Sequence, residues 1–341
     1  MKYDAAVIGA GPAGSIAAQS LSSNGHSTVI IDPCDTKKVC AGVLTARYAG
    51  TYPVDENYVQ RELKGIKISF KGICGEISYR KAVEYSIDRE VFDSMNLAGA
   101  LDSGSELIKE RVLSITEEKT GVKIHTNKNE YIADHVIMAA GVCELSQLFG
   151  GTKQYAYCTQ QVIDQQPGDH FEMELFPGGY SWKVPKKENV LSGTSSIKCY
   201  PDKCYPDIPG EKGLIPVNGP VKRTYSRRML LAGDAAGFVS PFDGEGIYYA
   251  RRSGEIAAQV LSGAISGNND VSEYEKCWKK DFDFFTLGKL SRLLSSDIVL
   301  EAFVREIRDN EIFNKVVEDI LTHESEKSKT KYMLSLVNKL I

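Results

Sequence analysis

Short apolar runs alternate with amphipathic stretches in the first part of the chain and predict strands and helices in turn. Residues 3–8 form a largely apolar run of strand length, residues 12–23 follow with a helical pattern, and residues 28–31 are a second apolar run. Short apolar runs bounded by turn residues are typical of the buried strands of a parallel sheet. The start of the chain therefore predicts a strand–helix–strand unit.

The pattern changes after residue 32. The runs GIKISF (residues 65–70) and GEISYR (residues 75–80) predict an antiparallel hairpin of a second domain. Residues 85–98 return to a helical pattern, and residues 133–141 predict another buried strand that is closed by Gly141. Further along, residues 229–232 predict a strand and residues 247–261 a helix. The predicted fold class is thus α/β for the part with alternating strands and helices, and α+β for the chain overall.

The last part of the chain is predicted to be helical. Beyond residue 268, apolar residues recur at helical spacing: Phe282, Phe285, Leu290, Ile298, Ala302, Phe303, Ile307, Ile312, Val316 and Ile320. We expect them to pack against the rest of the protein, because the polar faces mix both charge signs. A lid over a lipid pocket and contact with a membrane surface are the alternatives. Residues 324–331 (ESEKSKTK) predict an exposed linker.

Composition narrows the classes of protein. The 341 residues carry a formal net charge of −4 without a basic tract, which argues against nucleic acid as a partner. No apolar run has the length of a membrane span, and the N-terminus shows no secretion signal, so a cytoplasmic protein is expected. The eight cysteines contain no CxxC pair and there are five histidines, so no metal site is expected.

A glycine-rich turn follows the first predicted strand. Its sequence, GAGPAG, places Gly9, Gly11 and Gly14 at the spacing of the dinucleotide fingerprint, with Pro12 and Ala13 inside it. Gly9 suits the tight turn, Gly11 the approach of backbone to a pyrophosphate, and Gly14 the close packing of helix on strand. Asp32 ends the second strand, 18 residues after Gly14, where a ribose-binding acid is expected.

A second glycine-rich loop lies late in the chain, from Gly233 to Ile247. The predicted strand before it ends at Gly233-Asp234, and the Asp234 carboxylate could accept hydrogen bonds from sugar hydroxyls or cap a helix. Three residues bring backbone close to a flat ring at the start of the next helix: Pro241, Gly244 and Gly246. The helix start at Ile247 offers amide hydrogens to that ring. Glu245 is either part of this site or a first-turn charge that complements the helix dipole.

Together these motifs resemble the flavoprotein superfamily whose type fold is p-hydroxybenzoate hydroxylase. Arg89 with Asp93 matches its R-x-x-x-D segment near the cofactor, and Gly233 with Asp234 matches its ribityl-binding motif. The resemblance implies FAD as cofactor, a Rossmann-like FAD-binding domain, an inserted antiparallel-sheet substrate domain and a C-terminal helical region. The corresponding segments are residues 1–64, 83–150 and 225–268 for the FAD-binding domain, 65–82 and 151–224 for the substrate domain, and 269–341 for the helices. The sequence contains no second GxGxxG motif, so a resident NAD(P)H domain is not expected.

Two shorter stretches are similar to signatures of the geranylgeranyl reductase family. Residues 180–186 match its YxWxFPK pattern with Val184 in place of phenylalanine, and Cys40-Ala41-Gly42-Val43 departs from its Cys-Gly-Gly-Gly at two positions. The family implies FAD-dependent hydrogenation of isoprenoid double bonds in a lipid or prenyl substrate.

The resemblance also suggests catalytic residues. Cys40 would line the pocket or assist proton delivery, or it is a small loop hydrophobe. Tyr180 and Trp182 alternate along a predicted strand and share one face, which is either an aromatic wall for a prenyl chain or ordinary sheet core.

Partners and rival activities stay open at this stage. The electron donor is expected to be external: a ferredoxin, a reduced deazaflavin or NAD(P)H. Peripheral membrane contact is a further expectation, and a monomer is favoured. An FAD-dependent monooxygenase or halogenase on the same fold is the rival enzyme, and an electron-transfer flavoprotein acting on a quinone is the other alternative.

Overall fold

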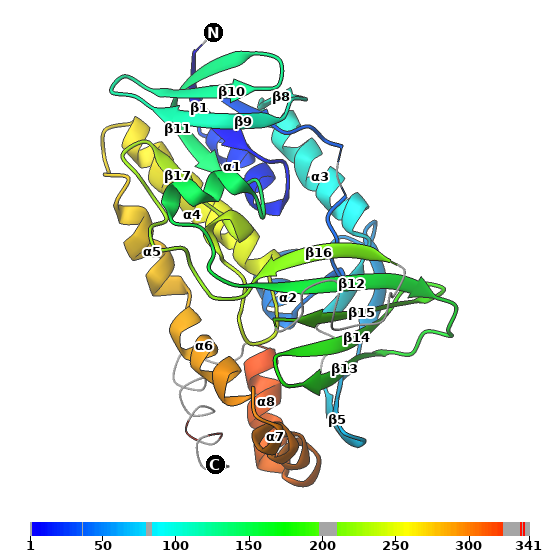
Figure 1. Cartoon of the computed structure of the whole chain (residues 1–341). Coiled ribbons are helices and arrows are strands. Elements are labelled where there is room, and N and C mark those ends of the chain that lie inside the picture. The colour runs from blue at the N-terminus through cyan, green and yellow to red at the C-terminus, as the bar shows by residue number, and fades with distance from the viewer. Residues whose placement is uncertain are drawn as a thin grey trace.

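The N-terminal strand–helix–strand unit lies at the centre of a largely parallel sheet (Figure 1). A computed structural model describes residues 2–35, 37–79, 84–197 and 210–322, together with residues 335 and 337. Strand β1 (Lys2–Ile8) leads into helix α1 (Pro12–Ser23) and strand β2 (Thr28–Ile31). On its other side β1 pairs in parallel with β11 (Glu130–Met138).

This first sheet has the order β8-β2-β1-β11-β10-β9, with β17 also paired to β11. The remaining strands are β8 (Glu106–Ile108), β9 (Val112–Glu117), β10 (Val122–Thr126) and β17 (Met229–Leu231). Helix α1 packs against α3 (Arg89–Asp102) and α4 (Ile247–Ile265). Their small and apolar side chains join those of β1, β2 and β11 in one buried core.

A second sheet, of order β16-β12-β15-β14-β13-β5-β6, lies beside the first (Figure 1). Its strands are β5 (Gly65–Phe70), β6 (Ile73–Ser78), β12 (Tyr155–Ile163), β13 (His170–Phe176), β14 (Gly179–Pro185), β15 (Val190–Ser196) and β16 (Glu211–Pro216). Strands β5 and β6 form the expected antiparallel hairpin. All neighbours are antiparallel except β5 and β13.

A small sheet of order β3-β7-β4 connects the two large ones. It consists of β3 (Val43–Leu44), β4 (Val59–Leu63) and β7 (Glu84–Ile87), with helix α2 (Ala46–Thr51) beside it. The prediction of a helix from residue 85 was therefore wrong at its start. Asp88 ends the strand and its carboxylate accepts the backbone N–H groups of Glu90 and Val91, so that α3 begins at Arg89.

Four helices follow α4 in the described part of the chain: α5 (Glu273–Asp281), α6 (Phe284–Leu293), α7 (Asp297–Asp309) and α8 (Glu311–Leu321). Leu290, Phe303, Ile307 and Ile320 are buried in a core shared with β5 and β6. The packing expectation was wrong for Phe285, Ile298 and Ile312, which are 70%, 76% and 73% exposed because they lie on the outer faces of their helices. The predicted linker, residues 324–331, lies outside the described residues.

The architecture confirms the mixed α/β fold class. The two large sheets take their strands from different segments of the chain, while the assignment of a cofactor domain and a substrate domain stays a prediction. None of the helices in the described ranges is long and apolar enough to cross a membrane.

Candidate active site

A cavity of about 1080 Å³ lies where the two large sheets and the C-terminal helices meet. Its lining is of two kinds. The polar lobe is formed by the glycine-rich turns and by the residues around them: Gly9, Gly11, Pro12, Ala13, Asp32, Lys38, Cys40, Ala41, Gly42, Arg89, Gly141, Gly233, Asp234, Gly246 and Ile247. The apolar lobe is formed by the second sheet, by Phe242 of the late loop, by Leu294 directly after α6, and by α7 and α8: Ile66, Ile68, Phe171, Met173, Leu175, Tyr180, Phe242, Leu294, Phe303, Val317 and Leu321. Trp182, Gly244 and Glu245 also line this cavity.

The three fingerprint glycines differ in what surrounds them. A Cβ at Gly14 would lie 1.9 Å from the carbonyl oxygen of Gly9, so only glycine allows α1 to pack on the turn. Gly9 has a φ of 105°, and its Cβ would meet the Ala139 carbonyl at 2.4 Å. Gly11 faces open space and precedes α1 without any side-chain cap. The free amides at this helix start therefore face the cavity, as a phosphate-binding site requires.

Asp32 supports this turn from the end of β2. Its carboxylate accepts the backbone N–H of Ala10 at 2.8 Å and that of Cys34 at 2.6 Å. These bonds hold the fingerprint turn against the loop that follows β2. The predicted ribose contact stays a prediction, and the position of Asp32 on the cavity wall is compatible with it.

The late glycine-rich loop faces the same lobe. Asp234 lies in a short 3₁₀ helix, η2 (Gly233–Ala236), whose preceding residue is Ala232, and Gly233 has a φ of 61°. The Asp234 carboxylate forms an ion pair with Nζ of Lys38 at 2.7 Å, and this carboxylate is the main cause of the raised pKa of Lys38. Sequence reasoning missed Lys38, because the two residues are 196 positions apart.

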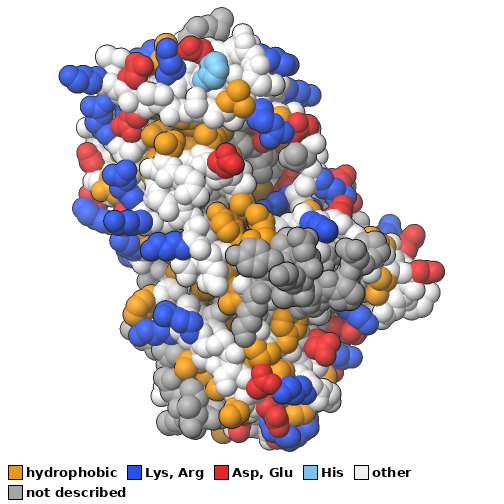
Figure 2. Space-filling view, viewed as in Figure 1, with side chains coloured by type: hydrophobic (Ala, Val, Ile, Leu, Met, Phe, Trp, Pro, Cys, Tyr) orange, Lys and Arg blue, Asp and Glu red, His pale blue; other side chains and the backbone are white. Residues whose placement is uncertain are grey.

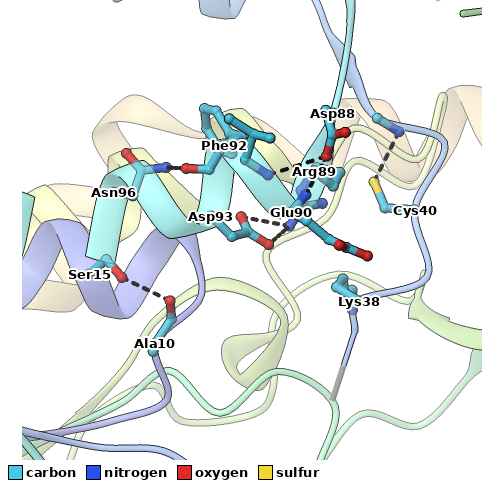
Figure 3. A network of polar contacts seen from close by, with 12 residues as sticks. Ala10, Ser15, Lys38, Cys40, Asp88, Arg89, Glu90, Phe92, Asp93 and Asn96 are labelled. Atoms are coloured by element: carbon cyan, nitrogen blue, oxygen red, sulfur yellow. Dashed lines mark hydrogen bonds and ion pairs between the residues drawn. The ribbon is translucent and has the colours of Figure 1, made fainter. Parts of the chain in front are cut away.

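Arg89 lies at the start of α3, next to Cys40 and Lys38 (Figure 3). Its Nη2 donates to both carboxylate oxygens of Asp93, at 3.1 and 2.9 Å. Its Nε is buried and has no hydrogen-bond partner among the described residues. The Cys40 thiol is a weak acceptor beside this guanidinium, so the Nε of Arg89 is open to a stronger acceptor from a bound group. The uncapped start of α1, the open position at Gly11 and the unpaired Nε of Arg89 together fit FAD.

The loop Cys40–Gly42 is held by a partly buried lysine. Nζ of Lys186 donates to the carbonyl oxygens of Ala41 at 2.8 Å, Ile87 at 3.1 Å and Gly42 at 3.4 Å. Burial lowers the pKa of Lys186 to about 8, although the neighbouring Cys40 acts in the opposite direction. Sγ of Cys40 accepts the Gly42 N–H at 3.4 Å. The lysine of the YxWxVPK motif thus positions the loop that carries Cys40.

Tyr180 and Trp182 share one face of β14, as expected, with ring centroids 5.8 Å apart. The Tyr180 hydroxyl donates to the Asp243 carbonyl at 3.2 Å and therefore contacts the late loop. Trp182 packs flat against Gly193 of β15, where a Cβ would lie 2.3 Å from its ring. Tyr180 is placed at the junction of the two lobes, and Trp182 supports it from the sheet.

Glu245 is buried at the end of the late loop. Its carboxylate accepts the Thr45 hydroxyl and lies 3.8 Å from Nη1 of Arg47. Burial raises the pKa of Glu245 to about 7, and the Arg47 guanidinium opposes that shift. Gly246 precedes α4 without a side-chain cap, and both Gly246 and Ile247 line the cavity. Pro241 and Gly14 do not line the cavity, and Pro241 lies near Gly288 of α6.

Sequence reasoning also missed Tyr79 and Glu84, which line the cavity between the two lobes. No motif marks them. They come together only because the small sheet brings the start of β7 next to the end of β6.

Comparisons with known proteins agree with this site. The family of pyridine nucleotide-disulphide oxidoreductases matches residues 3–170. The digeranylgeranylglycerophospholipid reductase 3 of Methanosphaera stadtmanae is 30% identical, and the match covers 84% of each chain. The digeranylgeranylglycerophospholipid reductase of Methanococcus vannielii is 26% identical over 99% of this chain and 95% of that one. The structure of a geranylgeranyl bacteriochlorophyll reductase-like protein from Thermoplasma acidophilum is 24% identical, with a TM-score of 0.82 over 100% of this chain and 99% of that one.

Halogenases have the same fold. The flavin-dependent brominase Bmp2 superposes with a TM-score of 0.76 at 16% identity, over 99% of this chain and 98% of that one. The fold and the site thus define an FAD-dependent oxidoreductase. Within that class, the chain belongs to the geranylgeranyl reductase family.

Proposed function

We propose that this protein hydrogenates isoprenoid double bonds of a lipid or prenyl substrate. The proposal rests chiefly on the continuity of the cavity, whose polar lobe fits FAD and whose apolar lobe adjoins it directly. An isoprenoid chain requires such an apolar wall, because burial of hydrocarbon provides most of its binding energy. The relatives named as digeranylgeranylglycerophospholipid reductases support the same substrate class.

FAD would be held by residues of four segments. The fingerprint turn and the start of α1 would bind the pyrophosphate, Asp32 the ribose, Arg89 a phosphate or ring oxygen, and Asp234 the ribityl chain. When bound and reduced, FAD supplies the hydride that an alkene reduction needs.

The residues of the apolar lobe orient the substrate and exclude water. An isolated alkene is a poor electrophile, so its reduction depends on a close and fixed approach to the hydride donor. Tyr180, backed by Trp182, would hold the prenyl chain at the junction of the lobes. Cys40, on the loop that Lys186 fixes, would contact the reacting region from the opposite segment of the lining.

The electrons are proposed to come from an external donor: a ferredoxin, a reduced deazaflavin or NAD(P)H. The sequence has one dinucleotide fingerprint, at residues 9–14. FAD would occupy it, so no second fingerprint is available for a resident NAD(P)H. Addition of each donor to the oxidised holoenzyme under anaerobic conditions, followed at the flavin absorption band, would identify the one that reduces it.

We also propose a peripheral membrane contact at the end of the molecule formed by α6, α7 and α8 (Figure 1). Phe285, Ile298 and Ile312 lie near the starts of these helices and are the most exposed large hydrophobic residues of the described chain. The apolar lobe is lined by Phe303 of α7, Val317 of α8 and Leu294, which directly follows α6. A membrane-embedded substrate would therefore meet the protein next to its cavity. Figure 2 shows hydrophobic side chains on the lower half of the molecule, with charged side chains around them.

The test of the proposed activity uses the holoenzyme reduced chemically under anaerobic conditions. Addition of a geranylgeranylated lipid is expected to reoxidise the flavin and to raise the lipid mass by two units per reduced bond, because each hydrogenation adds two hydrogen atoms. A saturated phytanyl lipid is the matched control and should leave the flavin reduced.

Other outcomes would favour the rival activities. Oxygen consumption with NAD(P)H that an aromatic substrate accelerates would indicate a monooxygenase. Reoxidation by a quinone, with no change in any prenyl lipid, would indicate an electron-transfer flavoprotein. A protein that cannot be loaded with FAD would contradict all three.

A further inference from the structure

A carboxylic acid and a phenol are buried together in the wall of the cavity. Glu84 begins β7 and Tyr79 follows β6, and these residues are only 5% and 8% exposed. The backbone N–H of Tyr79 donates to the Lys64 carbonyl at 2.8 Å, which fixes the end of the β6 strand. Glu84 pairs with Leu63 of β4 in the small sheet. Both side chains line the cavity beside Ile66 and Ile68 of the apolar lobe.

Each of these side chains has a polar atom without a partner. Oε2 of Glu84 and the hydroxyl oxygen of Tyr79 are buried, and neither forms a hydrogen bond with the described residues. A buried polar atom that stays unpaired is costly, because it has lost its water and gained nothing in return. The two groups lie within reach of each other, since the Tyr79 hydroxyl lowers the pKa of Glu84, and on the cavity wall both are also open to a molecule in the cavity.

Glu84 is held in its neutral form. Burial raises the pKa of its carboxyl group to about 8, and the nearby acids Glu245 and Asp243 raise it further. The Tyr79 hydroxyl and the backbone amide of Ala46 act in the opposite direction. Tyr79 itself has a pKa raised by burial and by Glu84, and Glu318 of α8 adds to that effect. Near neutral pH the carboxyl group therefore carries a proton that it can donate.

The other acids near this junction are occupied. Glu245 accepts the Thr45 hydroxyl and lies beside Arg47, and Asp243 accepts the Glu245 backbone N–H at 3.1 Å. The Tyr180 hydroxyl donates to a backbone carbonyl, and its pKa is raised by burial, so it is a weak acid.

We propose that Glu84 is the general acid that protonates the substrate alkene, a role that rests on the proposed function. In this step the π electrons of the C=C bond form a C–H bond to the carboxyl proton, and the O–H bond of Glu84 breaks. Reduced FAD, when bound, would supply the hydride that forms the C–H bond at the other alkene carbon. The alkene would thereby gain two electrons and the flavin lose two. The Glu84 carboxylate then takes up a proton from water after the product has left, and Tyr79 is the neighbouring hydroxyl that can stabilise it.

The experiment compares Glu84→Gln with Glu62→Gln in the FAD-loaded protein. The E84Q side chain keeps the shape and polarity of the original but has no acidic proton, and Glu62 is an exposed carboxylate on β4, the strand paired with β7. We expect flavin reoxidation by a geranylgeranylated lipid, in a single turnover, to slow by about 100-fold or more in E84Q. E62Q should match the wild type, and Glu84→Asp should recover part of the rate.

The pH profile and the infrared spectrum give readouts that a structural role would not change. The wild-type rate should fall as pH rises through about 8, because ionised Glu84 cannot donate a proton. The carbonyl stretching band of protonated carboxyl groups should contain, in wild type and E62Q, a component that titrates near pH 8, and E84Q should lose that component while it keeps the one of Glu245 that titrates near pH 7. This band can be recorded without any substrate.

The outcomes separate the two proposals. If E84Q turns over as fast as the wild type, or keeps the carboxyl band component that titrates near pH 8, the role of Glu84 is overturned and the reductase activity still stands. A wild-type protein that reduces no prenyl double bond overturns both. Should E84Q fail to retain FAD, then E84D decides: a rate equal to wild type and independent of pH up to about 10 overturns the proposal.

Discussion

At the scale of single residues, the fingerprint glycines have separable functions. Gly14 is required by packing within the protein, since a Cβ there would collide with the Gly9 carbonyl oxygen. Gly11 has no neighbour within 4 Å that a Cβ would meet, so packing within the chain does not require it. The open space at Gly11 lets a bound group approach the backbone there.

We therefore expect Gly14→Ala and Gly11→Ala to have different effects. Gly14→Ala should lower the free energy of unfolding by about 1–3 kcal/mol through overpacking. Gly11→Ala should change it by at most about 1 kcal/mol, as is typical at a helix N-cap, while it weakens FAD binding at least about tenfold. Urea unfolding of the apoprotein and titration with FAD measure the two quantities.

Gly50→Ala is the matched control, because Gly50 lies in α2 and its Cβ would also face open space. It should leave both the stability and the FAD affinity close to the wild type. Equal FAD affinity in Gly11→Ala and wild type would contradict the proposed approach of the pyrophosphate to this turn.

At the scale of elements, Lys186 links strand β14, the Cys40–Gly42 loop and strand β7. It follows the end of β14, and its ammonium group binds carbonyl oxygens of the Cys40–Gly42 loop and of Ile87, the last residue of β7. The second sheet and the polar lobe are therefore joined by one partly buried cation. This contact gives a physical reason for the lysine in the YxWxVPK motif.

Lys186→Met should release this loop. The side chain keeps most of its length but loses its donors, and hydrogen bonds to a charged group contribute about 1.5–3 kcal/mol each. We expect FAD affinity to fall at least about tenfold, measured by quenching of flavin fluorescence.

The neighbouring Lys187→Met is the control, since that side chain is exposed, and it should bind FAD as the wild type does. A Lys186→Met protein with unchanged FAD affinity and unchanged turnover would show that the loop is held by other contacts.

At the scale of the whole molecule, the C-terminal helices have two different surfaces. Their inner faces carry the buried residues of a core shared with the second sheet, and their outer faces carry Phe285, Ile298 and Ile312. Exposed apolar residues of this size favour contact with a lipid surface when charged side chains surround them.

The triple variant Phe285→Ser, Ile298→Ser and Ile312→Ser should lose binding to vesicles made of equal parts phosphatidylcholine and phosphatidylglycerol, measured by co-sedimentation. Removal of apolar area from the contact lowers its binding energy. Turnover of detergent-dispersed substrate should stay unchanged, because none of the three residues lines the cavity.

Val162→Ser is the control, since Val162 on β12 is 62% exposed and lies away from these helices in the second sheet. Vesicle binding that the triple variant retains in full would contradict the membrane contact at this end.

Much of the fold follows from local patterns in the sequence. The strand–turn–helix of β1 and α1, the late loop before α4 and the hairpin of β5 and β6 depend on residues that are neighbours in the chain. The start of α3 was misplaced because Tyr85 to Ile87 suit a strand or a helix equally by pattern. Their pairing with β4, which is a contact between distant segments, makes them a strand.

The chemistry of the cavity depends far more on tertiary structure. Local spacing was enough to indicate a dinucleotide, because glycine turns and helix starts bind phosphate through their own backbone, and the resemblance to a known flavoprotein superfamily then implied FAD. The ion pair of Lys38 with Asp234, the hold of Lys186 on the Cys40 loop and the neutral state of Glu84 were not visible in that way. They arise from burial and from charges that distant segments bring together, and the protonation of a carboxyl group is decided by those surroundings rather than by its position in the chain.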